Sequence, residues 1–534
     1  MSICFPRGTR ATVFASVFTL GLNLPSQAAD VTTAQANDVA QQLRTWLAGL
    51  LANRVPISPE MLMVVPAGES YNVSVRFPGG FIARSDEAGK PTDAWLTAIV
   101  RPEQGTRWRI ESMKLPATFR LTPEAAAAMG AMGAMGAMGA TDADEPLAPK
   151  PPNDQKEPPA APVAVPSMEW QTRTQTASGV FDTAQASDSR LEYRMEGIKY
   201  EARNLGGSPE SHVTVERIAG LSVMHPTPSG AVDFGAEGVM DGYTSVSTNP
   251  IIGSVRVSAK RVVGRGAIGA VMTSQLADLI RTVVTLGMDA NAAKESGTDL
   301  NGKDEKAVRA AVRTMIAQLK GIMGGAKLEE TFEGIEVQAG DGRGSAEQAG
   351  FSFGGDAPAD KLQAFTEFSA ASLKIQGTPP QYADFVPRSF VVRPTVANID
   401  VKGLTKLAED ASADGADPDE MQARLLNLVT NSGVRLGFEH LDVDLGFASM
   451  VASGTATVVG PNAYRGQADV TVMGLDDLMQ RVQKLPDSGQ ALAVLAMAKG
   501  IGQADGKKTT WHIAMSEDSK VMINGMDMSK MGRK

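Results

Sequence analysis

The chain has 534 residues, one cysteine and a formal net charge of −9. An acidic chain without a basic cluster lacks the positive field that attracts nucleic acid or anionic membranes, so neither is expected as an electrostatic partner. Its length allows about two to four domains and a large hydrophobic core.

The first 28 residues have the three parts of an export signal. Arg7 and Arg10 precede an apolar run over residues 11–24, and small residues at Ser26 and Ala28 form a cleavage site. We expect an exported mature protein with no transmembrane segment; an uncleaved signal that anchors the chain in the membrane is the alternative. Cys4 leaves with the signal, so the mature chain has no disulfide and no cysteine metal ligand.

Residues 29–122 have the pattern of a small domain of helix and sheet. Apolar side chains recur at helical spacing from Val39 to Leu51, and Pro56 ends the helix. We interpret this stripe as core rather than as a membrane or cofactor surface. Alternating apolar residues then predict strands over 71–77, 96–100 and 108–110.

Residues 123–167 differ in composition from both flanking regions. Glycine occupies every third position from Gly130 to Gly139, and prolines are frequent from Pro146 to Pro166. The glycine repeat is short and has no internal proline, so it is not expected to form a triple helix. Because this stretch has little that could form a buried core, we expect a disordered tether between two domains.

Residues 168–534 are predicted to form a large β-rich region of the α+β class, built on a long twisted antiparallel sheet. In three strands the alternation of apolar and polar residues changes phase, at Gly197, at Gly334 and at His440. A bulge that turns over the faces of the strand explains the two changes at glycine. Such strands are typical of a strongly curved sheet.

A few helices are expected between the strands. Apolar residues at helical spacing predict helices over 276–284, 308–323 and 419–429, the last of them capped by Asp417 and Pro418. At the end of the chain, residues 511–515 and 521–523 are predicted to pair as a hairpin.

One unit occurs twice in the large region, over residues 397–408 and 468–479. In each copy an alternating strand leads into a glycine, Gly403 or Gly474, after which leucines follow at helical spacing. We interpret the unit as a strand followed by a short helix that packs back over the sheet. The repetition then indicates one sheet assembled from similar modules.

Residues 264–269 match the G-x-G-x-x-G spacing of a dinucleotide-binding turn. The strand before them alternates and carries cations, which is typical of a half-exposed antiparallel strand, whereas a dinucleotide site requires a buried parallel one. A plain glycine connection is therefore the favoured interpretation, and no cofactor is expected.

Residues 350–354 match the spacing of a nucleophile elbow around Ser352. The apolar strand that should precede an elbow is missing. A serine hydrolase that combines Ser352 with Asp442 or Asp444 and with His512 is nevertheless kept as an alternative.

Metal-binding patterns are weak. The four histidines are scattered without ligand spacing, at His212, His225, His440 and His512. Oxygen-bearing residues cluster as in a calcium loop but without the EF-hand spacing, at Asp299, Asn301, Asp304 and Glu305. Asp442 and Asp444 would share one sheet face, which we interpret as a solvated face. No catalytic, cofactor-binding or metal-binding residue is assigned.

The repeated strand-Gly-Leu-x-x-Leu units and the closing segment, residues 521–528, resemble those of Gram-negative envelope proteins. From about residue 168 to the end, the chain is similar to a family of alphaproteobacterial periplasmic proteins known only as a domain of unknown function, and more distantly to the AsmA-like proteins. The resemblance implies a β-rich periplasmic protein without catalytic residues. The AsmA-like relatives further imply an elongated curved sheet that offers an apolar groove to lipid. The N-terminal domain and the missing membrane helix depart from their pattern.

These features together predict an exported, non-enzymatic envelope protein that binds lipid or another amphiphile in a sheet-lined groove. Such a groove requires an apolar sheet face that helices leave open, and ordinary packing of the predicted helices over this face is the favoured interpretation. A scaffold that meets an envelope protein through a sheet edge or the tether is the second hypothesis.

Overall fold

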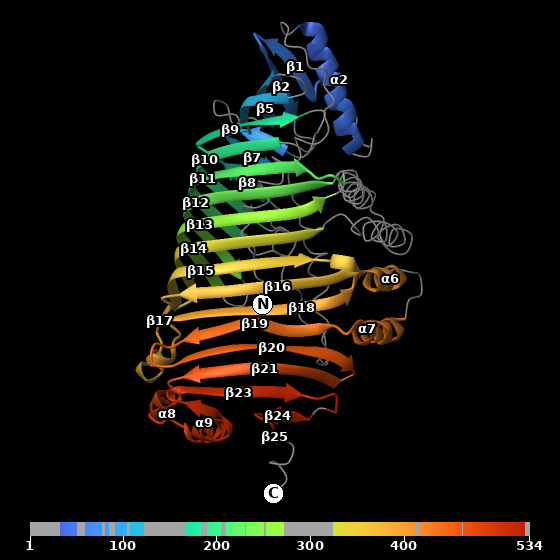
Figure 1. Ribbon diagram of the computed structural model, residues 1–534. Coiled ribbons are helices and arrows are strands. Elements are labelled where there is room, and N and C mark those ends of the chain that lie inside the picture. The colour runs from blue at the N-terminus through green and yellow to red at the C-terminus, as the bar shows by residue number, and fades with distance from the viewer. Residues whose placement is uncertain are drawn as a thin grey trace, which may run out of the picture.

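The protein is built on one antiparallel sheet that contains all 25 of the described strands. The computed structural model describes residues 32–50, 59–76, 81–84, 91–103, 107–121, 167–182, 189–203, 210–229, 231–249, 253–271, 324–411, 417–461, 463–518 and 520–528. In Figure 1 the strands lie side by side from β1 and β2 at the top to β24 and β25 at the bottom. The predicted β-rich α+β class with a long twisted antiparallel sheet is confirmed.

Several predicted features lie outside the described residues. They are the export signal, the tether predicted over 123–167 apart from Ser167, the helices over 276–284 and 308–323, and the acidic loop with Asp299, Asn301, Asp304 and Glu305. Ser167 begins strand β8.

The N-terminal part contributes a helix and two branches of the sheet. Helix α2 (Thr33–Leu50) lies beside a branch that pairs in the order β1–β2–β5–β6, and a second branch pairs in the order β4–β3–β7. The bounds of these strands are β1 (Leu62–Ala67), β2 (Ser70–Arg76), β3 (Phe81–Arg84), β4 (Pro91–Asp93), β5 (Trp95–Pro102), β6 (Arg107–Lys114) and β7 (Thr118–Leu121).

These branches continue directly into the large sheet. Strand β6 pairs with β9 (Thr174–Asp182), and β7 pairs with β8 (Ser167–Gln171). Ala36 and Val39 of α2 belong to the same buried cluster as Trp108 on β6 and Leu191 of the large region. The region over 29–122 therefore shares both its sheet and its core with the strands that follow it.

The rest of the sheet is a succession of antiparallel neighbours. The long strands, in their order across the sheet, are β10 (Ser189–Arg203), β11 (Glu210–Pro226), β12 (Val232–Asn249), β13 (Gly253–Val271), β14 (Gly325–Ala339), β15 (Gly342–Asp356), β16 (Lys361–Ala371), β18 (Ser389–Asp400), β19 (Arg435–Asp444), β20 (Ser449–Gly460), β21 (Ala463–Met473) and β23 (Lys508–Met515). Shorter elements are β17 (Lys374–Gln376), β22 (Gln503–Asp505), β24 (Val521–Ile523), β25 (Met526–Asp527), and the 3-10 turns η1 (Pro358–Asp360) and η2 (Pro380–Phe385). The pairing of β23 with β24 confirms the terminal hairpin.

A crease crosses strands β10 to β15. The alternation of faces reverses on all six strands at residues that lie opposite one another, which are Gly197, Glu216, Gly242, Lys260, Gly334 and Glu347. The three glycines have φ of 63°, 63° and 60°, a left-handed conformation that glycine adopts at little cost. The predicted phase changes at Gly197 and Gly334 are confirmed. Their interpretation as bulges is wrong, because the pairing register does not shift across the crease.

A true bulge does occur farther along the sheet. Arg393 pairs with His440 whereas the next residue, Pro394, pairs with Phe438, so β19 contains one extra residue. The phase change predicted at His440 is therefore an insertion, which turns over the faces of β19 at Glu439 and His440.

The remaining described helices form two pairs, one between β18 and β19 and the other between β21 and β22. They are α6 (Val401–Ala411), α7 (Pro418–Ser432), α8 (Leu475–Val482) and α9 (Gly489–Ile501). Helix α7 confirms the helix predicted over 419–429, with the Asp417 side chain accepting a hydrogen bond from the Asp419 amide at 2.9 Å. Figure 1 places α6 and α7 beside the ends of β16, β18 and β19, and α8 and α9 beside the opposite ends of β21 and β23.

The two copies of the repeated unit differ at their glycines. In both, a strand is followed directly by a short helix, as predicted, with β18 leading into α6 and β21 into α8. Gly474 is the N-cap of α8, with φ of 74°. In the first copy, however, the helix begins at Val401, so Gly403 lies inside its first turn. Only the second glycine marks the switch from strand to helix.

Candidate functional site

The sheet has one apolar face that extends from β10 to β23. Its members are in register from strand to strand, and most residues between them along the strands are polar or charged; β11 is an exception, with Ala219, Leu221 and Val223 on the other face. On β10 to β15 they are Leu191, Tyr193, Met195, Ile218, Gly220, Ser222, Met224, Phe234, Ala236, Gly238, Met240, Val262, Gly264, Gly266, Ile268, Ala326, Leu328, Glu330, Phe332, Ala349, Phe351, Phe353 and Gly355. On β16 to β23 they are Ala364, Thr366, Phe368, Ala370, Phe390, Val392, Pro394, Val396, Leu436, Phe438, Leu441, Val443, Met450, Ala452, Gly454, Ala456, Gly466, Ala468, Val470, Val472, Thr509, Trp511, Ile513 and Met515.

The crease bends the sheet toward this apolar face. Ile198 and Val215, on one side of the crease, belong to the same buried cluster as Val262 and Met195 on the other side. Glu216 and Lys260 on the crease itself are exposed. Apolar side chains thus gather on the concave side of the bend, and charged ones lie on the convex side.

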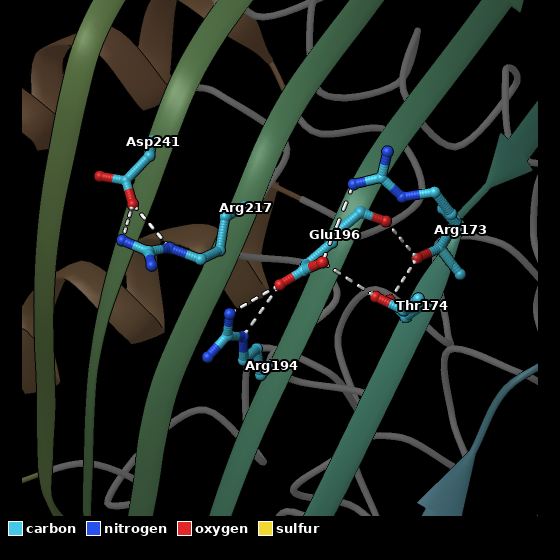
Figure 2. A network of polar contacts seen from close by, with 7 residues as sticks. Arg173, Thr174, Arg194, Glu196, Arg217 and Asp241 are labelled. Carbon is cyan, nitrogen blue, oxygen red and sulfur yellow. Dashed lines mark hydrogen bonds and ion pairs between the residues drawn. The ribbon is translucent and has the colours of Figure 1, made fainter.

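The opposite face carries a network of ion pairs. Figure 2 shows Arg217 of β11 paired with Asp241 of β12, and Arg194 paired with Glu196 on β10. Thr174 of β9 also donates a hydrogen bond to Glu196, at 3.4 Å. The hydrogen bond from Arg194 is the main cause that lowers the pKa of Glu196. Because these side chains are exposed, the face that carries them is the solvated side of the sheet. Exposed ion pairs of this kind add little stability.

Described helices leave much of the apolar face uncovered. The exposed fractions of Phe353 on β15 and Leu436 on β19 are 42% and 46%. At the C-terminal end, α9 packs against β23, where the Trp511 indole donates a hydrogen bond to the Ala498 carbonyl at 2.8 Å. Even there, Val494 of α9 is 54% exposed. The described helices therefore do not form the layer over the apolar face that ordinary packing predicts.

Glu330 is the one charged residue among the positions that define the apolar face. It lies on β14 between Leu328 and Phe332, opposite Gly264 on one neighbouring strand and Phe351 on the other. Only 5% of the residue is exposed, and this burial raises the pKa of its carboxyl group. The sequence analysis did not identify Glu330. Its position could have been recognised, because Leu328, Glu330 and Phe332 alternate along one strand and must therefore share one face.

The residues of the alternative serine hydrolase do not come together. Ser352 lies in the middle of β15 and not at a strand-to-helix turn, and it faces the polar side, opposite Glu329 and Glu367. His512 on β23 is six strand spacings away, which corresponds to roughly 30 Å. Asp442 and Asp444 on β19 are three spacings, or roughly 14 Å, from the strand of His512. His512 pairs with Asp469 instead.

The glycines of the G-x-G-x-x-G spacing lie inside a strand. Gly264, Gly266 and Gly269 all belong to β13, whose neighbours β12 and β14 are both antiparallel to it. The interpretation as a glycine connection is therefore wrong, and the surroundings are also unlike those of a dinucleotide-binding turn, which follows a parallel strand.

The side chains weighed as metal ligands form no metal site within the described residues. No group of three or more His, Cys, Asp or Glu side chains that could hold a metal occurs within the described ranges. His212 approaches Glu201 at 3.2 Å, and His440 lies 3.9 Å from Asp442. Asp442 and Asp444 do share the polar face, as predicted.

The fold and this face define a β-rich protein with an open two-sided sheet. No protein-family model matches the sequence, and a comparison with curated proteins finds no significant match. Across the part of the chain that the structure describes, we find no helix with the length and apolar composition needed to cross a membrane.

Proposed function

We propose that the chain is an exported, non-enzymatic protein of the Gram-negative cell envelope that binds lipid or a similar amphiphile along its apolar face. The observation that carries this proposal is the continuity of the face. Eleven strand spacings of about 4.8 Å separate β10 from β23, so the face is roughly 50 Å long. Water-exposed apolar patches of this extent are rare unless they bind a partner.

The chemistry of the face fits acyl chains better than a polar ligand. Side chains such as Phe351 and Phe368, whose rings are 5.4 Å apart, offer contact without hydrogen-bonding groups. Burial of an acyl chain contributes about 0.8 kcal/mol per methylene group. A long chain can therefore bind to this surface through the hydrophobic effect alone.

The test compares two substitutions that introduce the same charge on opposite faces of the sheet. Leu436→Glu places a carboxylate on the apolar face, and Val451→Glu places one on the polar face of the adjacent strand, where the exposed fraction is similar, 46% against 44%. Each protein is exported, purified and extracted, and its lipids are quantified by mass spectrometry. We expect copurifying lipid with the parent chain and Val451→Glu, and a severalfold loss with Leu436→Glu.

The absence of lipid from the parent chain would contradict the proposal. If crosslinking in cells then captured an envelope protein at a sheet edge or at the tether, the scaffold hypothesis would replace it.

A further inference from the structure

One stretch of the apolar face, which we call the glycine floor, lacks side chains on three neighbouring strands. Gly220 on β11, Gly238 on β12 and Gly264 on β13 lie directly opposite one another, between Tyr193 on β10 and Glu330 on β14. The Tyr193 side chain covers Gly220, and its hydroxyl oxygen is 3.2 Å from the position that a Cβ would take at Gly238. No described atom lies within 4 Å of the corresponding position at Gly264. Tyr193 thus fills the floor over Gly220 and reaches Gly238, so the floor is open at Gly264, and we call this open position the depression.

Two buried polar groups border this depression. Glu330 is 5% exposed at the end opposite Tyr193, and within the described part of the chain it has no hydrogen bond or ion pair. Ser222 follows Gly220 on the same face of β11 and is also 5% exposed. Its hydroxyl oxygen is buried and has no hydrogen-bond partner among the described residues. Buried polar groups normally have partners, and the described residues supply none to either of these two groups.

We propose that the glycine floor binds the head group of an amphiphile that carries an ammonium group, with Glu330 as its counter-charge. The inference rests on the proposed function, since the tail of the amphiphile would lie along the apolar face. Ammonium N–H groups would donate hydrogen bonds to the Glu330 carboxylate. Ser222 is three strand spacings from Glu330, or roughly 14 Å, so its hydroxyl would donate to an ester oxygen beyond the phosphate and not to the phosphate itself.

Charge complementarity selects this class of ligand. Glu330 is the only charged residue among the positions of the apolar face, so the face itself offers no cation to it. A buried carboxylate is costly unless it is paired, and charge-assisted hydrogen bonds are the stronger ones. An anionic head group would not stabilise the carboxylate form of Glu330, and a neutral one would leave it without a counter-charge.

The test uses two lipids that share their acyl chain and phosphate and differ in the ammonium group. Lysophosphatidylethanolamine and lysophosphatidylglycerol are titrated at monomeric concentrations into the full chain, and binding is measured by calorimetry. The parent chain should prefer lysophosphatidylethanolamine by about 10-fold, the factor that 1.4 kcal/mol of binding free energy produces. Glu330→Gln should abolish the preference with little change for lysophosphatidylglycerol. Glu333→Gln, on the polar face of the same strand, should keep it.

A second pair of variants tests the depression independently of the acid. Gly264→Leu adds a side chain where the floor is open, and Gly344→Leu adds the same side chain elsewhere on the apolar side, across the crease. Only Gly264→Leu should remove the preference. Equal affinity of the parent chain for the two lipids, or a preference that survives Glu330→Gln, would overturn the inference and leave the proposed function standing. Failure of both lipids to bind would contradict the proposed function itself.

Discussion

Replacing each of the two repeat glycines by alanine should have very different effects on stability. Gly474 has φ of 74°, and a Cβ there would lie 2.5 Å from the backbone oxygen of Phe447. The left-handed conformation costs an alanine about 1–2 kcal/mol. Relief of a contact with fixed backbone adds about 1–3 kcal/mol. We expect Gly474→Ala to destabilise α8 and β21 by about 2–4 kcal/mol, after allowing for the lower entropy of the unfolded alanine chain.

Gly403→Ala is the matched variant. Gly403 lies inside α6, where alanine is favoured over glycine by about 1 kcal/mol. Its new Cβ would meet the Leu428 side chain at Cδ1, the end of a flexible group that can rotate away. We therefore expect a change within about 1 kcal/mol of zero.

Hydrogen exchange measured by mass spectrometry gives the opening free energies directly. Peptides over residues 463–482 report on Gly474, and peptides over 389–411 report on Gly403. A cost for Gly403→Ala that equals or exceeds the cost for Gly474→Ala would refute the assignment of only the second glycine to the strand-to-helix switch.

Four further predictions concern titration, the crease and catalysis. Burial raises the pKa of Glu330 above its usual 4.5, so folding is favoured while the acid is protonated, and this contribution to stability is lost as pH rises through the raised pKa. The urea midpoint of the parent chain should therefore fall with rising pH relative to that of Glu330→Gln. Parallel curves for the two proteins would contradict the burial of the acid. The hydrogen bond from Lys520 lowers the pKa of Asp518 to about 2; NMR titration of Lys520→Met should show this pKa move toward 3.8, and no movement would be inconsistent with the pair. Gly334 has φ of 60°, and a Cβ there would lie 2.8 Å from Lys260 Cδ, so Gly334→Ala should destabilise the crease by about 1–2 kcal/mol. Gly340→Ala is the control, because Gly340 is also left-handed but has no described neighbour within 4 Å of its Cβ position. The difference between the two variants separates the effect of the contact from that of φ. Ser352→Ala should leave any hydrolytic activity of the preparation unchanged, because His512 is six strands away; loss of an activity would revive the hydrolase alternative.

Periodicity along the sequence was sufficient to predict strands, two of the crease glycines, helix α7 and the terminal hairpin. It did not predict the crease as a line, because the line depends on which residues of neighbouring strands face one another. Gly242, for example, lies on β12 among several other glycines and has no local signal that distinguishes it. Register between strands is a property of pairing, which a single strand does not encode.

The short motifs in the sequence are limited in the same way, because they do not show which residues of neighbouring strands lie opposite one another. Gly264 and Gly266, two of the three glycines that match a cofactor spacing, occupy the apolar face of one strand. The role that we propose for Gly264 emerges only when Gly238 on one neighbouring strand and Glu330 on the other are placed opposite it. Spacing within one segment cannot show a depression that three strands build together.

Site-specific photo-crosslinking in living cells tests the central claim most directly. A benzophenone amino acid replaces Phe353 on the apolar face or Val451 on the polar face, positions with exposed fractions of 42% and 44%. If the apolar face binds amphiphiles, the probe at position 353 attaches to lipid and the probe at position 451 does not. Equal lipid labelling at both positions, or labelling of protein alone at position 353, would contradict the account.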